Sequence, residues 1–229
     1  KIINDRAKRK EKTRINKDAK QFYEFWKNVD KIKDLVKSIS EKEYPNVPQY
    51  LVLDHFWHYI KVEWYKENEI TLNKNNREIE IPKIFRQYIK WQKTADGGDY
   101  PKQMFIQSKK IFQVYLSKKN IDVLSKTQAK EIFKGLHSSN MPIKRFSADD
   151  LFISQNDIRK IRKSLKYLLY SNDDMSLKIH NLMKNSNYKL DRLGSSGIQE
   201  INGWTNPNVF PIRNDKADKA IEILGYRFK

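Results

Sequence analysis

The chain contains no cysteine among its 229 residues. Disulfide bonds, thiol nucleophiles and cysteine-ligated zinc are therefore excluded. The sequence also lacks any run of about 18 apolar residues, which argues against a membrane-spanning helix. No signal peptide is visible, so we expect a cytoplasmic location and no membrane partner. Because the chain begins with Lys1 rather than Met, we expect it to be part of a longer protein.

Acidic residues are scarce compared with basic ones. The chain has 28 Asp and Glu against 46 Lys and Arg, which gives a formal net charge of +18 and a pI near 9.8. Such a field attracts polyanions, with nucleic acid expected first and an acidic membrane surface second. A lysine-rich composition from an AT-rich genome would explain the lysines but not the shortage of acids. The excess is concentrated in residues 1–20, 101–145 and 155–189.

The remaining composition predicts a folded, mainly α-helical protein. Hydrophobic residues make up 38% and aromatic residues 12% of the chain, which argues against disorder. Apolar side chains recur at helical spacing over residues 21–39 and 49–67. In residues 69–81 apolar and polar residues alternate instead, with Ile70 and Leu72 before a polar turn and two isoleucines after it. This pattern predicts one small β-hairpin within the helical bundle, with another helix after Pro82.

The order of these segments suggests three parts. Residues 1–20 read as a basic arm or linker, and residues 21–95 as an aromatic-rich helical domain with the β-hairpin. The loop at residues 95–99 is the best internal boundary. Residues 101–229 then read as a basic helical domain.

The last third of the chain carries the most informative pattern. LGSSG, residues 193–197, predicts a tight turn between two helices, with successive backbone N–H groups pointing outward. A loop bounded by Pro207 and Pro211 follows, and it leads into a final helix that ends at Gly225. Helix N-termini attract anions, so this segment could hold a phosphate in a basic protein. A simple helical hairpin with a glycine cap is the structural alternative.

Residues 160–226 resemble the helix–hairpin–helix region of the DNA glycosylase superfamily. They are also similar to segments of modification-dependent restriction and anti-phage proteins that carry a loop followed by PI-x-N, here PIRN. In the glycosylases the hairpin holds the DNA backbone. The Schiff-base lysine of that family corresponds to Gln199, its catalytic aspartate to Asn214, and its first hairpin glycine to Ser195. Neither Gln nor Asn can perform the chemistry of the residue it replaces. The resemblance therefore implies DNA binding rather than catalysis.

The predicted DNA contacts come from the hairpin, the PIRN loop and a basic helix. Basic residues recur every three or four positions on that helix, opposite its apolar face, although an ordinary solvated face would look the same. We expect these residues to contact DNA: Ser195, Ser196, Gly197, Ile198, Gln199, Arg213, Asn214, Lys216, Arg159, Arg162, Lys163 and Lys166.

Other reactive side chains favour structural roles. His55 and His58 are three residues apart and would need a third ligand, such as Asp54 or Glu63, to bind a metal. Their aromatic surroundings favour packed histidines instead. We interpret two pairs of adjacent acids, Asp149/Asp150 and Asp173/Asp174, as helix N-terminal residues. Glu78, Glu80 and Lys83 resemble a nuclease cluster, to which we give little weight.

We expect Trp204 to pack beneath the loop rather than to wedge near DNA. We expect neither a metal nor a cofactor.

Three functional hypotheses follow. The first is a non-catalytic DNA-binding module of a larger restriction or anti-phage defence protein, gripping duplex phosphates and contacting other domains or subunits of a complex. The second is an enzyme, either a glycosylase or a nuclease using Asp215 or an acid cluster. The third is an RNA-binding or protein-interaction adaptor.

Overall fold

The computed structural model describes residues 2–94, 98 and 100–227, with side chains from residue 19 onward. The described residues form helices and turns and contain no strand, which confirms the mainly helical prediction. None of these helices is both long enough and apolar enough to cross a bilayer. The helices are α1 (Ile2–Glu43), α2 (Gln49–Tyr59), α3 (Tyr65–Asn68), α4 (Arg77–Gln92), α5 (Tyr100–Ser108), α6 (Lys126–Lys134), α7 (Asn140–Phe146), α8 (Ala148–Gln155), α9 (Ile158–Tyr170), α10 (Met175–Lys184), α11 (Ser195–Thr205) and α12 (Asp215–Ile223).

Short turns of other helical types connect several of these elements. A π-helical turn, Ile60–Trp64, joins α2 to α3, and a second one, Lys109–Gln113, continues α5. Two 3₁₀ turns, Ile121–Val123 and His137–Ser139, precede α6 and α7. The second 3₁₀ turn becomes important below because it carries His137 and Ser138.

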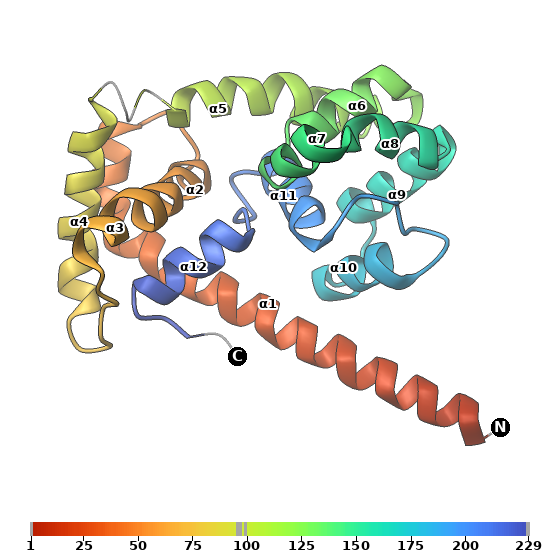
Figure 1. Cartoon of the computed structure of the whole chain (residues 1–229), viewed down its shortest axis with the longest axis horizontal. Coiled ribbons are helices and arrows are strands. Elements are labelled where there is room, and N and C mark those ends of the chain that lie inside the picture. Colours follow the sequence, from red (N-terminus) through yellow and green to blue (C-terminus); the bar gives the residue numbers. More distant parts are fainter. Residues whose placement is uncertain (1, 95–97, 99, 228–229) are drawn as a thin grey trace.

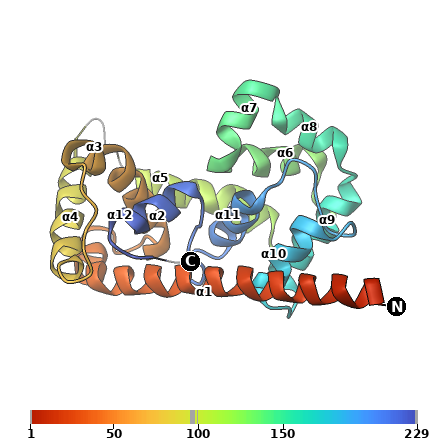
Figure 2. The same cartoon turned by 60° about the horizontal axis from the view of Figure 1, so that its bottom comes forward.

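Helix α1 runs along one side of the molecule and contacts both of its ends (Figure 2). Phe25, Val29, Ile32 and Val36 are buried at intervals of three and four residues, which is the stripe that an amphipathic helix buries. This stripe packs against α2 and α4 at one end, and α1 also contacts α10 and α12. Residues 2–20 of the predicted basic arm, residues 1–20, form the start of α1. The side chains of residues 1–18 lie outside the described part.

The last helix of the chain, α12, packs against helices from the start of the chain. Helix α12 packs on α2 and on the Ile60–Trp64 turn, while α11 packs on the Lys109–Gln113 turn and on α10 (Figure 1). The described buried apolar side chains form one continuous core from Phe22 to Tyr226. Residues far apart in sequence therefore meet at the start of α12. The division into two domains remains a prediction, and its boundary at residues 95–99 lies, apart from Gly98, outside the described residues.

The predicted β-hairpin over residues 69–81 is wrong. The Asn73 side chain accepts hydrogen bonds from the amides of Asn75 and Asn76, and α4 begins directly afterwards at Arg77. Acidic residues in its first turn favour a helix N-terminus. Ile81 is buried on the helical face of α4 while Ile79 is 64% exposed. The alternating isoleucines are thus compatible with a helix. The amide of Leu72 donates a hydrogen bond to the carbonyl of Ile223 in α12 rather than to a neighbouring strand.

Side chains cap several of the helices. Ser125 and Gln128 form the reciprocal capping box at the start of α6. Asp157 caps α9 and Asp174 caps α10, each by accepting a hydrogen bond from a first-turn amide. Asn214 caps α12 by accepting from the amides of Lys216 and Ala217. These helix starts therefore have their first-turn donors partly satisfied.

The region predicted as a tight hairpin is arranged differently. Helix α10 ends at Lys184, residues 185–194 form turns, and α11 begins at Ser195. Ser195, Ser196 and Gly197 therefore occupy the first turn of α11 rather than a bend between two helices. Arg192 adopts a left-handed conformation with φ of 70°, which turns the chain into α11.

Candidate nucleic-acid interface

The first turn of α11 lacks the side-chain cap that the neighbouring helices have. Its N-cap residue is Gly194, and no described side chain accepts a hydrogen bond from this turn. The first amides of a helix have no intrahelical acceptor, so those of Ser195 and Ser196 can donate to an external one. Ser195 is exposed and Ser196 is half-buried, whereas Gly197 and Ile198 are buried. The accessible donors are thus the first two of the predicted amides.

This helix start opens onto a cavity of about 620 Å³. Residues of the α11 and α12 starts line it together with the His137–Ser139 turn and the first residues of α7. A smaller cavity of about 310 Å³ lies between α1, α10 and the same two helix starts. The two cavities share Ser195, Ser196, Asn214 and Asp215. The predicted hairpin and PIRN residues therefore lie at one place on the fold.

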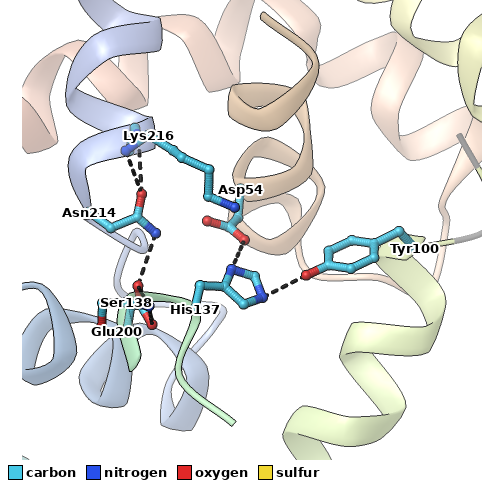
Figure 3. Close-up of polar contacts among 8 residues, drawn as sticks. Asp54, Tyr100, His137, Ser138, Glu200, Asn214 and Lys216 are labelled. Atoms are coloured by element: carbon cyan, nitrogen blue, oxygen red, sulfur yellow. Dashed lines mark hydrogen bonds and ion pairs between the residues drawn. The ribbon is translucent and has the colours of Figure 1, made fainter. Parts of the chain in front are cut away.

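Glu200 links three of the segments around the larger cavity (Figure 3). Its carboxylate accepts a hydrogen bond from the Asn214 side chain at 3.1 Å and from the Ser138 amide at 3.2 Å. Glu200 is completely buried, and burial together with the nearby charge of Asp54 raises its pKa to about 7. Glu200 therefore changes its charge near neutral pH at the junction that positions the starts of α11 and α12.

A second chain of polar groups lies behind this junction (Figure 3). Burial lowers the pKa of His137, so the ring is neutral near pH 7. Burial raises the pKa of Tyr100, whose hydroxyl oxygen lies 2.6 Å from His137 Nε2. His137 Nδ1 faces the carboxylate of Asp54 at 3.6 Å. Asp54 is 2% exposed, and neither of its oxygens has a hydrogen-bond donor among the described groups.

The two histidines of α2 are packed among aromatic rings. The ring of His55 stacks on Tyr100 at 4.3 Å between centroids and contacts Tyr88 and Gln92 through Nδ1. Burial, with smaller contributions from neighbouring positive groups, lowers its pKa to about 3. Within the part of the chain that the structure describes, no group of three or more His, Asp or Glu residues could hold a metal ion. The acid pair Asp173/Asp174 supplies the cap of α10.

Each basic residue of the α9 stripe contacts another group of the protein, although the stripe remains at the surface. Arg159 pairs with Asp157 at 3.2 Å, and Lys166 pairs with Asp122 at 2.6 Å. The remaining two cations are also occupied, because Arg162 donates to the Leu124 carbonyl and Lys163 lies over the ring of Tyr188. None of these four residues lines either cavity. The stripe therefore lies outside both cavities, and its contact with DNA stays a prediction.

The remaining predicted contacts divide into two groups. Arg213 is half-buried, pairs with Asp218 at 2.8 Å and lies over the ring of Phe25, and Gln199 donates to the Ser195 hydroxyl at 3.0 Å. Lys216, by contrast, lines the larger cavity, as does Arg192, which the sequence did not single out. Trp204 is completely buried, as expected for packing beneath the loop. Arg192 is exposed, whereas Lys216 is half-buried and its side chain extends toward Asp54 (Figure 3).

Sequence reasoning missed the polar junction itself. Tyr100, the neighbours His137 and Ser138, and Glu200 come from three separate segments, and no sequence spacing connects these segments. Glu200 carried one weak signal, because it lies between Ile198 and Ile201 in a helix that is buried on most sides. A charged residue in such a helix needs a buried partner.

A scan against protein-family models finds no match, and searches of curated proteins and of solved structures find none either. The resemblance to glycosylases and defence proteins therefore remains a prediction.

We expect Asn214→Ala to lower the free energy of unfolding by about 2 kcal/mol, because it removes the α12 cap and one donor to the buried Glu200. Asn214→Ser keeps a capping hydroxyl and should lose about half as much. Urea unfolding of the three proteins measures both values. Equal losses in the two variants would show that the cap contributes nothing.

Proposed function

We propose that this chain binds duplex DNA by holding a backbone phosphate at the start of α11. The observation that carries the proposal is the uncapped first turn of α11, whose exposed end opens onto a cavity lined by Lys216 and Arg192. Amides at a helix N-terminus, with cations beside them, form a favourable site for a phosphate. The net charge of +18 supports a polyanionic partner.

The shape of the α11 start also allows a phosphate to approach its backbone closely. A Cβ atom added at Gly194 would meet no described atom within 4 Å, so the backbone is open on that side. Two acidic residues line this cavity beside Lys216: the buried Glu200, and Asp215 in the first turn of α12. The resemblance to restriction and anti-phage segments is the reason to place this binding module in a larger defence protein.

The decisive experiment removes one amide without disturbing the helix. Ser195 is the first residue of α11, where proline is well tolerated, and Gly194 has the extended conformation that suits a residue before proline. Ser195→Pro deletes the amide hydrogen and the hydroxyl, whereas the control Ser195→Ala deletes only the hydroxyl. We expect Ser195→Pro to weaken duplex binding about tenfold or more relative to Ser195→Ala, the effect of one charge-assisted hydrogen bond.

Fluorescence anisotropy with a labelled duplex at several salt concentrations measures this difference. Affinity should fall steeply as salt rises, because phosphate contacts release counterions. Equal affinities for the two variants, or binding that is insensitive to salt, would contradict the proposal. Competition with a structured RNA separates the alternatives, since a clear preference for RNA would favour the RNA-binding adaptor.

A catalytic role is the second candidate, because the exposed carboxylate of Asp215 lines both cavities. Modified and unmodified duplexes are incubated with the protein, with and without magnesium. Product that disappears with Asp215→Ala would show an enzyme rather than a binding module.

A further inference from the structure

Helix α7 exposes apolar side chains to solvent. Phe146 is 63% exposed and Met141 is 53% exposed, while only Pro142 and Ile143 are partly covered. Its main contacts are with its chain neighbours, the His137–Ser139 turn and α8. In Figure 2, α7 lies at the edge of the molecule opposite α1. Exposed phenylalanine and methionine side chains on a projecting segment favour a partner that covers them.

The charges on α7 indicate what that partner is. Lys144 and Arg145 are exposed between the two apolar residues, and no described acidic side chain forms an ion pair with either. The segment therefore combines apolar side chains with free cations. Proteins that open the base stack of DNA combine an apolar wedge with cations that hold the adjacent phosphates. Charge complementarity thus favours a nucleic acid over an apolar protein surface.

The position of α7 relative to the α11 start supports this partner. Met141 and Pro142 form part of the wall of the 620 Å³ cavity, and Ser195, Ser196 and Arg192 line the same cavity. A strand whose phosphate lies on the α11 amides would therefore pass beside α7. Lys144 and Arg145 would then face further phosphates of the same duplex.

We propose that α7 is a wedge that inserts Phe146 between base pairs of the duplex held at the α11 start. This inference rests on the proposed function, because the duplex must first be bound there. The wedge would unstack one base step, and stacking of a base on Phe146 would replace part of the lost stacking energy.

The test uses Phe146→Ala in the full chain with a duplex that contains 2-aminopurine, a base whose fluorescence rises when it is unstacked. The matched control is Val123→Ala, because Val123 is an apolar residue that is 72% exposed and belongs to the Ile121–Val123 turn rather than to α7. Phe146 is exposed, so its truncation should leave the circular dichroism spectrum and the unfolding midpoint unchanged. We expect wild type and Val123→Ala to raise the fluorescence on binding. Phe146→Ala should abolish that rise and weaken binding about tenfold.

The salt dependence separates the wedge from the phosphate contacts. Phe146→Ala should leave the slope of affinity against salt unchanged, whereas Lys144→Ala with Arg145→Ala should make it shallower. If Phe146→Ala binds and unstacks like wild type while Ser195→Pro loses affinity, the wedge is wrong and the proposed function stands. If wild type binds no duplex, both are wrong. Binding to acidic phospholipid vesicles that depends on Phe146, without any effect on duplex binding, would also overturn the wedge.

Discussion

Gly225→Ala is expected to destabilise the protein by about 3 kcal/mol, because a side chain there is doubly unfavourable. Gly225 has φ of +80°, which alanine adopts only at a cost. Its added Cβ atom would also overlap the carbonyl oxygen of Leu72 and lie 3.0 Å from the carbonyl carbon. Both atoms belong to backbone, so no side-chain rotation relieves the overlap.

The contact at Gly225 joins the end of the chain to the segment before α4. The Gly225 carbonyl accepts from Arg77 Nη1 at 2.9 Å, and the Arg77 guanidinium lies 3.9 Å from the centroid of the Tyr226 ring. The Leu72 amide donates to the Ile223 carbonyl at 2.8 Å. Displacing Leu72 would therefore disturb the position of α12, and the candidate interface depends on that position.

The control for this variant is Gly98→Ala. Gly98 is also left-handed, with φ of +56°, but an added Cβ would meet no described atom within 4 Å. It should cost only about 1 kcal/mol, the conformational part of the effect. Urea unfolding measures both variants. If Gly225→Ala costs no more than Gly98→Ala, the close approach to Leu72 is not part of the folded state.

Glu200→Gln is expected to change the pH dependence of stability by about 3 kcal/mol. The pKa of Glu200 is raised from 4.5 to about 7 in the folded protein, so the folded state binds more protons than the unfolded state between these values. The free energy of unfolding of wild type therefore loses a Glu200 contribution as pH rises through this window. At 1.36 kcal/mol per pKa unit, the full change is about 3 kcal/mol.

Glutamine carries no titrating proton, so the variant lacks this contribution. Its stability relative to wild type should improve as pH rises from 4.5 to 8. The buried histidines act in the opposite direction, since a lowered pKa such as that of His55 makes stability increase as pH rises. That effect is common to both proteins and cancels in their difference. A difference in unfolding free energy that stays constant from pH 4.5 to 8 would contradict the assignment.

Local patterns predicted much of the secondary structure. The stripe of Phe25, Val29 and Ile32 follows the period of a helix, and the Ser125 capping box depends on neighbours within four residues. The segment at residues 69–81 failed because alternation over a few residues does not distinguish a strand from a helix start. Burial of Ile81 against the core decided in favour of the helix.

The candidate site was predicted only in part. Ser195 and Lys216 were identified from glycine, proline and charge patterns, and both lie at the same cavity. The α9 stripe looked equally basic in sequence, but Asp122 and Asp157 occupy two of its cations. Asp157 is only two residues from Arg159, but Asp122 comes from another segment, and sequence spacing does not show its pairing with Lys166.

By itself the sequence determined the helical class and the excess of positive charge, because each depends on composition or on residues a few positions apart. Only the tertiary structure decided which cations remain available and which groups meet at the buried junction. Asp54, Tyr100, His137 and Glu200 are distant in sequence, and packing of α2 on α5 and of α11 on the His137–Ser139 turn brings their segments together. Their burial, rather than their identity, raises the pKa of Glu200 and keeps His137 neutral.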